Sequence, residues 1–137
     1  CERFDSAKKE GAWLFIIDVD NFKSINDSYG HLAGNKALKL LADIMRDSVC
    51  GGDLLCRMGG DEFLILYCRP LTADEAADTA RRLIENVGQI GGEVPINGIS
   101  IGITQTADGQ SLHSAIKKAD KALYISKTSG KNTFTAV

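Results

Sequence analysis

A short, unbroken apolar run near the start of the chain constrains the fold more than any other feature. Trp13 to Ile17 are all apolar, and Asp18 and Val19 follow directly. The run is far shorter than the ~20 apolar residues of a membrane span. A continuous run of this length, ending in an acidic residue, is typical of a buried strand. We therefore expect residues 13–19 to form a strand inside the fold.

The rest of the chain alternates between helical and strand-like patterns. Apolar residues recur at helical spacing over residues 31–49, over 72–87 with Thr72 as N-cap, and from about Ser111 to a C-terminal cap at Gly130. Strands are expected over 54–57 and 62–68, which flank a Gly59-Gly60 turn, and over 99–104 and 132–137. Within 99–104, Gly102 would allow a close approach of another backbone. This order predicts an α+β fold with a mainly antiparallel sheet flanked by helices.

Length and composition limit the number of domains and the classes of partner. The 137 residues suffice for one domain, residues 1–137, and no repeat or linker interrupts them. With 16 basic and 18 acidic residues, the net charge of −2 predicts no basic face for a nucleic acid polymer or an anionic membrane. The four cysteines lack metal-binding spacing, so we expect reduced thiols in a cytosolic fold. Because the chain opens on Cys1, we expect a domain excised from a longer protein.

Acidic residues follow the predicted buried strand. A buried carboxylate costs free energy unless it is paired or bound to metal, so we interpret Asp18 as a metal ligand. Asp20 is expected to point to the other side and to N-cap a short helix that begins near Asn21.

A second acidic cluster follows the Gly59-Gly60 turn. Two glycines allow a tight turn and remove side chains where a phosphate chain could approach. Asp61 and Glu62 come directly after them. Since Mg²⁺ prefers oxygen ligands and often keeps substrate phosphates in its shell, Asp18 and Asp61 on neighbouring strands would suit it. Taken alone, the same residues could form a simple hairpin turn.

Four segments together resemble one family. The segments are DVDNFKSIND with YGHLAG, then RMGGDEF, then ISIGI, and finally ADKALYISKTSGKN. In this order and spacing they resemble the GGDEF family of diguanylate cyclases over essentially the whole chain. The resemblance implies the palm-like, adenylyl-cyclase-related form of the ferredoxin-like α+β fold, which agrees with the predicted order of helices and strands.

The resemblance also implies an activity and its site residues. Diguanylate cyclases condense two GTP into cyclic di-GMP and release two pyrophosphates. By resemblance, Asp18, the carbonyl of Val19 and Asp61 would hold Mg²⁺ or Mn²⁺, and Asp61, aided by Glu62, would activate the 3′-hydroxyl. The positions that match phosphate-binding residues of the family are the backbone amides of Phe22 and Lys23, together with Lys127 and Lys131 for the triphosphate. The positions that match nucleoside-contacting residues are Asn26, His31 and Asn35. Gly59 and Gly60 match the substrate-binding turn. Without the other motifs, the two lysines would be solvated side chains at a helix end.

Three positions depart from the family pattern. Asn35 stands where the family usually has an aspartate that accepts two guanine hydrogen bonds, so relaxed base selectivity is one hypothesis. Lys131 replaces an arginine, which keeps the charge but loses the planar fork. In the Arg-x-x-Asp motif of product inhibition, Cys50 replaces the arginine while Asp53 is retained. We therefore expect no tight feedback through a degenerate inhibitory site.

Three functions are compatible with this pattern. The leading one is a metal-dependent diguanylate cyclase that works as a homodimer under an upstream sensory segment. The second is a degenerate GGDEF module that binds GTP or dimerises without turnover, and the third is a cyclic di-GMP receptor, which Cys50 disfavours. GTP is cytosolic, so we expect this domain to face the cytoplasm without contacting a membrane, whether or not the complete protein is tethered to one.

Overall fold

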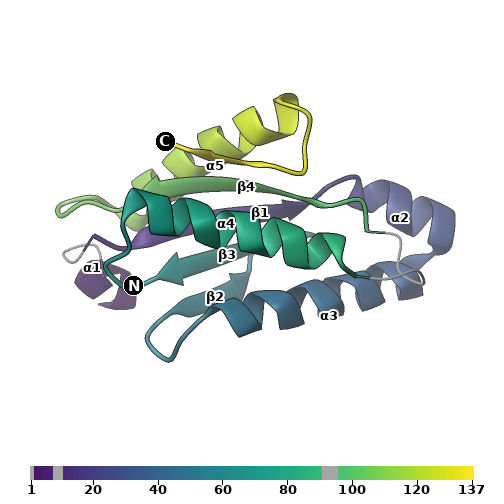
Figure 1. Ribbon diagram of the computed structural model, residues 1–137, viewed down its shortest axis with the longest axis horizontal. Helices are drawn as coiled ribbons and strands as arrows, with labels where there is room; N and C mark the ends of the chain where they lie inside the picture. Colours follow the sequence, from purple (N-terminus) through teal and green to yellow (C-terminus); the bar gives the residue numbers. More distant parts are fainter. Residues whose placement is uncertain (1, 8–10, 91–95) are drawn as a thin grey trace.

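A single sheet of five strands organises the chain. The computed structural model describes residues 2–7, 11–90 and 96–137. Along the chain the elements are α1 (Glu2–Ala7), β1 (Trp13–Val19), α2 (Phe22–Tyr29), α3 (His31–Ser48), β2 (Leu54–Arg57), β3 (Glu62–Tyr67), α4 (Ala73–Gly88), β4 (Ile99–Gln105), α5 (Leu112–Thr128) and β5 (Phe134–Ala136). Figure 1 shows β1 near the middle of the sheet, running toward α2 at one end of the molecule.

The strand order is β2-β3-β1-β4-β5. β1 is antiparallel to both β3 and β4, β2 is antiparallel to β3, and only β5 runs parallel to its neighbour β4. The register sets Trp13 opposite Tyr67 at one end of β1 and Asp18 opposite Glu62 at the other. The polar end of β1 therefore lies beside the start of β3, directly after the hairpin turn.

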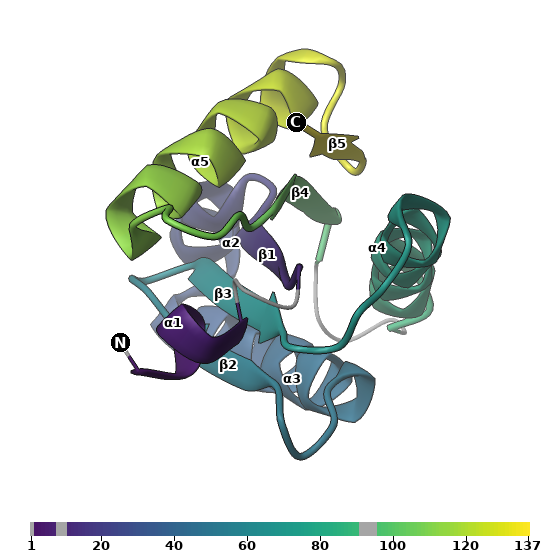
Figure 2. The ribbon, with the colours of Figure 1, turned by 90° about the vertical axis from the view of Figure 1, so that its left-hand side faces the viewer.

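Helices cover both faces of the sheet, which explains the unbroken apolar run in β1. Residues with odd numbers in β1, such as Phe15 and Ile17, pack with α3 and α4 in one core. Leu14 and Ile16 pack with α1 and α5 in a second core. Figure 2 shows these two layers, with α1 and α5 on one side of the sheet and α3 and α4 on the other. Since successive side chains of a strand point to opposite faces, both faces of β1 must be apolar.

Local sequence signals account for where several helices begin and end. Thr72 caps α4 in a reciprocal capping box with Glu75, and the Ser111 side chain accepts a hydrogen bond from the amide of Ser114 at the start of α5. Gly30 separates α2 from α3 with a φ of 89°. The caps at Thr72 and Ser111 match the expected starts of α4 and α5.

The predicted elements are confirmed with small differences. The strand at 13–19 is confirmed at both ends, and the hairpin strands are confirmed within one residue. The last strand is shorter than expected, three residues from Phe134 to Ala136, because the preceding residues form the loop after α5. The glycine-rich connection predicted over 88–98 falls partly on residues 91–95, outside the described residues.

Gly102 lies where β4 meets α5. A Cβ atom at this position would come within 2.1 Å of the Ala119 carbonyl oxygen and 2.4 Å of the Leu123 amide nitrogen. The expected close backbone approach is therefore confirmed.

Two further sequence expectations concern cysteines and membrane spans. Cys50, Cys56 and Cys68 carry free thiols. Within residues 2–7, 11–90 and 96–137, none of the helices combines the length and the apolar character needed to cross a bilayer.

Candidate active site

Acidic and basic side chains gather at the end of β1 that leads into α2. The Val19 amide donates a hydrogen bond of 3.2 Å to the Asp61 carbonyl, which fixes the hairpin turn beside this end of the strand. The turn, α2 and the C-terminal end of α5 surround a hollow of about 220 Å³. Its lining residues are Asp18, Val19, Asp20, Asn21, Phe22, Lys23, Asp61, Lys127 and Lys131. Seven of the site residues expected from the sequence are thus brought together.

Asp18 is a buried carboxylate of this hollow, and it is paired with a lysine. Its side chain is 12% exposed, and its Oδ2 accepts a hydrogen bond from Nζ of Lys127, which reaches it from α5. Burial raises the pKa of Asp18, Lys127 opposes this shift, and the neighbouring Asp61 adds to it. Burial would lower the pKa of Lys127, but the Asp18 hydrogen bond and the surrounding carboxylates raise it overall. At neutral pH the ammonium of Lys127 is therefore the counter-ion of the cluster.

Glu62 lies beside the hollow rather than in its lining. It is opposite Asp18 in the antiparallel register, so both side chains are on the α5 face of the sheet. Burial raises the pKa of Glu62, with further contributions from Asp120 and Asp18. Burial likewise raises the pKa of Asp120, the acidic residue of α5. Glu62 thus adds negative charge next to Asp18 and Asp61.

The interpretation of Asp20 as an N-cap is wrong. Its Oδ1 accepts a hydrogen bond of 2.5 Å from the Ser100 hydroxyl, and its Oδ2 accepts one of 2.8 Å from the Asn132 amide. Ser100 is the cross-strand partner of Asp18, so Asp20 shares that face, and the expectation of opposite sides is also wrong. Residues two apart on a strand point the same way. Asp20 is a buried anchor for the loop that follows α5.

That loop brings Lys131 into the lining of the same hollow as the Asp18–Lys127 pair. Lys131 and Asn132 have φ angles of 62° and 47°, in the left-handed region. The Lys131 amide donates to the Ser126 carbonyl, and its Nζ donates a hydrogen bond of 2.7 Å to Oδ1 of Asn21. The two lysines therefore have different partners, Lys127 a carboxylate and Lys131 an amide oxygen.

The start of α2 also opens onto the hollow. Asn21 precedes the helix with a φ of 55°, and its side chain makes no capping hydrogen bond to the first turn. Instead, its Oδ1 is used by Lys131. Phe22 and Lys23 form the first turn and line the hollow. A helix start without a side-chain cap suits an anionic group such as a phosphate.

The hairpin turn is held by its own arginine. Arg57 donates hydrogen bonds of 3.0 Å to the Gly59 carbonyl and 2.7 Å to the Gly60 carbonyl. Both glycines are exposed, and an added Cβ would meet no atom within 4 Å at either of them. The backbone of the turn is thus accessible to a ligand next to Asp61.

The three positions expected to contact a nucleoside lie outside the hollow. Asn26 is on α2, and His31 and Asn35 are exposed in the first turns of α3. Gly34 lets the two helices meet, because a Cβ there would come within 1.9 Å of Oδ1 of Asn26. The predicted base-contacting residues therefore form a separate group at the α2–α3 junction, adjoining the hollow through α2.

Comparison with known proteins identifies the family. The family described as "Diguanylate cyclase, GGDEF domain" matches residues 2–133. This chain belongs to the GGDEF domain family. Diguanylate cyclase A of Treponema denticola is 37% identical over 134 residues, which cover 93% of this chain and 36% of that protein. Diguanylate cyclase DgcM of Escherichia coli is 39% identical over 125 residues, covering 90% of this chain and 30% of that protein.

A solved structure supports the same fold. The GGDEF domain of DgcB from Caulobacter crescentus, crystallised with c-di-GMP, superposes with a TM-score of 0.87 at 27% identity, over 98% of this chain and 86% of that one. The expected palm-like α+β fold is confirmed. The GGDEF domain described here spans about a third of the length of the two curated relatives.

The residues of the hollow fit a divalent metal ion, which GGDEF cyclases generally use. Oδ1 of Asp18 is buried and has no hydrogen-bond partner among the described residues. Three carboxylates and three lysines line the hollow, so a triphosphate would bring unbalanced negative charge. Among the described residues, no three His, Cys, Asp or Glu side chains converge on one point. This suits Mg²⁺, which often takes one or two carboxylates and completes its shell with substrate phosphates and water.

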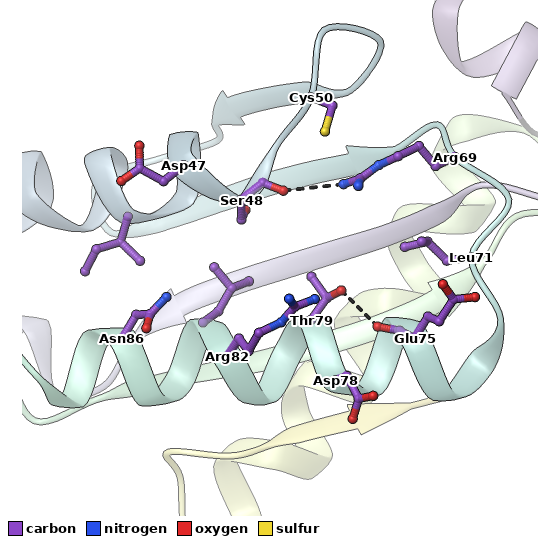
Figure 3. A pocket seen from close by; sticks show the side chains of 12 residues that line it. Asp47, Ser48, Cys50, Arg69, Leu71, Glu75, Asp78, Thr79, Arg82 and Asn86 are labelled. Carbon is purple, nitrogen blue, oxygen red and sulfur yellow. Dashed lines mark hydrogen bonds between the residues drawn. The ribbon is translucent and has the colours of Figure 1, made fainter.

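The turn from Cys50 to Asp53, which we expected to be a degenerate inhibitory site, lies at the other end of the sheet from the hollow. Asp53 accepts hydrogen bonds of 2.9 Å from the amides of Cys50 and Cys68 and pairs with Arg69 at 3.0 Å. Figure 3 shows Cys50 and Arg69 at the rim of a pocket between α3 and α4, where Arg69 also donates to the Ser48 carbonyl. Both oxygens of the Asp53 carboxylate therefore already bind groups of the protein itself.

Three residues of this arrangement were missed by the sequence analysis. Asn21 was expected only as a helix start, yet it holds Lys131. Gly34 stands in the YGHLAG segment, which was a usable signal for a close approach. Asp120 lies seven residues before Lys127, a helical spacing that places both on one face of α5 and could have revealed it.

Proposed function

We propose that this GGDEF domain is a diguanylate cyclase that condenses two GTP into cyclic di-GMP and two pyrophosphates. The observation that carries the proposal is the convergence of Asp18 and Asp61 beside Lys127, with one buried Asp18 oxygen that has no partner among the residues that the structure describes. Family membership and relatives named diguanylate cyclases support the same chemistry.

In the proposed reaction, the 3′-oxygen of one GTP bonds to the α-phosphorus of the other. The bond from that phosphorus to the pyrophosphate breaks, and the hydroxyl proton passes to a carboxylate, which we assign to Asp61 with Glu62 beside it. When bound at Asp18, the Val19 carbonyl and Asp61, Mg²⁺ or Mn²⁺ would neutralise the triphosphate and favour the attacking alkoxide. The same steps on the second nucleotide close the ring.

The chain's own residues would orient the substrate. Lys127 and Lys131 reach the hollow from α5 and the loop behind it, so they can bind the triphosphate from two sides. The uncapped first turn of α2, with Phe22 and Lys23, offers backbone amides to the terminal phosphates. Asn26, His31 and Asn35 would hold the nucleoside at the α2–α3 junction, and the glycine turn leaves room for the ribose and phosphates.

A homodimer is part of the proposal. One hollow offers one set of carboxylates and lysines, so the second GTP has to come from a second copy facing the first. We expect an upstream sensory segment to bring two copies together in the cytoplasm.

The alternative function is a module that binds GTP without turnover. Asn35 and Lys131 favour it, because each replaces a residue that the family usually uses for substrate. Both functions predict nucleotide binding, so turnover is the measurement that separates them.

Pyrophosphate release tests the proposal. The chain would be fused to a parallel coiled coil to enforce dimerisation and incubated with GTP and Mg²⁺ or Mn²⁺. We expect two pyrophosphates per cyclic product, with loss of at least a hundredfold in Asp61→Asn, on the scale of about 10²–10⁴-fold for a general base. Asp108→Asn, an exposed aspartate in the turn before α5, is the matched control. Binding of GTP without pyrophosphate release would support the non-catalytic module instead.

A further inference from the structure

The two oxygens of the Asp18 carboxylate have different environments. Oδ2 is paired with the Lys127 ammonium, whereas Oδ1 is buried without a partner in the part of the chain that the structure describes. A single carboxylate therefore holds one cation and retains one unused acceptor. A buried acceptor of this kind costs free energy until a cation or donor reaches it.

Lys127 is placed where it can exchange partners. Its side chain is 38% exposed, against 12% for Asp18, so the ammonium can swing outward while the carboxylate stays in place. The acidic groups that act on it are Asp18, Asp61 and Glu62, which include both carboxylates proposed to bind metal. A metal ion arriving at Asp18 would share this group of carboxylates with the ammonium and repel it.

Lys131 provides an internal comparison. It lies four residues further along the chain and lines the same hollow, yet its Nζ binds the Asn21 amide oxygen at 2.7 Å and not a carboxylate. A metal ion at Asp18 would not need to displace it. The two lysines carry the same charge and line the same hollow, but only Lys127 occupies a carboxylate that a metal ion would need.

We propose that the Lys127 ammonium acts as a resident counter-ion of Asp18, which gives way only when a metal ion and a triphosphate arrive together. This inference deepens the proposed function and rests on it, since it concerns the order in which the same site is filled. A metal ion alone would repel the ammonium from Asp18 without supplying it with a new anion. With a triphosphate present, the displaced ammonium gains the phosphate oxygens as partners.

Two consequences follow for binding. Metal affinity without nucleotide is held low by Lys127, and metal and nucleotide increase each other's affinity by the same factor, because linkage is reciprocal. The free protein would thus not retain metal in the absence of substrate.

Binding of Mn²⁺, followed by electron paramagnetic resonance of the free ion, tests this inference without turnover. In the absence of nucleotide, we expect Lys127→Met to bind Mn²⁺ about fivefold or more tightly than the wild type, at the lower end of typical coupling between sites. Lys131→Met, the matched control, should change the affinity by no more than about twofold, because an exposed charge without contact to the ligands is screened. Lys127→Gln serves as a second neutral variant, and Lys127→Arg, which keeps the charge, should stay near the wild type.

The same titration with 3′-deoxy-GTP, which lacks the attacking hydroxyl, completes the test. We expect the nucleotide to tighten Mn²⁺ binding strongly in the wild type and much less in Lys127→Met. Equal Mn²⁺ affinities of Lys127→Met and wild type, with binding still lost in Asp18→Asn, would overturn the inference and leave the proposed function standing. Absence of Mn²⁺ binding in every variant, even with nucleotide, would overturn both.

Discussion

Asp18 is the residue on which the proposed chemistry depends most. It follows the apolar part of β1 and pairs with Lys127, and its other oxygen is buried with no partner in the described part of the chain. Asp20, two residues later, has the same residue type and a similar burial, yet both of its oxygens are used by Ser100 and Asn132. The difference between a candidate ligand and a structural anchor therefore lies in which oxygens are already occupied.

Asn35 yields a prediction about base selectivity. A carboxylate accepts hydrogen bonds from two guanine donors, whereas an asparagine presents one acceptor and one donor, which suits adenine better. Asn35→Asp should therefore raise the preference for GTP over ATP by about 1–3 kcal/mol, the scale of one bidentate base contact. Dissociation constants of 3′-deoxy-GTP and 3′-deoxy-ATP would measure it, with Asn86→Asp on α4 as the control for added charge. A wild type that already binds GTP tenfold more tightly than ATP would contradict the hypothesis of relaxed selectivity.

Tyr67 yields a prediction about stability at high pH. Its ring is fully buried and its hydroxyl is 2.9 Å from that of Ser48, and burial raises the pKa of Tyr67 from 10.0 to about 12. The native state thus holds the phenol proton more tightly than the unfolded chain, so this contribution is complete below pH 10 and is lost as the pH rises toward 12. The full shift corresponds to roughly 3 kcal/mol of stability.

Urea unfolding of wild type and Tyr67→Phe at pH 8 and pH 11 would check this prediction. The free energy of unfolding should fall more steeply with pH in the wild type. An equal loss in both proteins would show that Tyr67 does not keep its proton through folding.

At the scale of elements, the contact between β4 and α5 sets the position of Lys127. Gly102→Ala would place a Cβ 2.1 Å from the Ala119 carbonyl oxygen, so α5 must shift away from the sheet. We expect a loss of about 1–3 kcal/mol in stability, as for overpacked cores, together with weaker nucleotide binding. Gly51→Ala, where a Cβ meets nothing within 4 Å, is the matched control. Equal urea midpoints for the two variants would rule out a tight contact at Gly102.

The turn between α3 and β2 yields a prediction about feedback. Because Asp53 already binds two backbone amides and Arg69, and Cys50 has no guanidinium, cyclic di-GMP should bind there weakly. Asp53→Ala should instead cost about 1–3 kcal/mol of stability, because two partly buried amides and Arg69 lose their acceptor. Calorimetric titration with cyclic di-GMP and urea unfolding would measure both effects. Tight product binding that Asp53→Ala abolishes would contradict this prediction.

Elements could be predicted more reliably than contacts. The strand at 13–19 and the cap at Thr72 follow from patterns within a few residues, and both are confirmed. The partners of Asp20 are Ser100 and Asn132, 80 and 112 residues away, so no local pattern could show them. The Lys127–Asp18 pair is also long-range, and only the family resemblance placed both residues in one site.

At the scale of the whole molecule, the two ends of the sheet differ in character. One end carries the acid cluster, the glycine turn and the lysines, and the other carries the Asp53 turn and the α3–α4 pocket. This hollow holds one set of groups for one triphosphate, so the proposed condensation of two nucleotides calls for two copies of the domain. Product formation per chain should therefore rise with chain concentration and become independent of it in the coiled-coil fusion.

Mass spectrometry of the product shows directly whether this domain is a cyclase. The fused dimer would be incubated with Mg²⁺ or Mn²⁺ and GTP, ATP or both. We predict cyclic di-GMP from GTP that disappears in Asp61→Asn, and a mixed product if Asn35 relaxes base selectivity. Bound GTP recovered unchanged, with no cyclic dinucleotide under any of these conditions, would contradict the assignment of this domain as a cyclase.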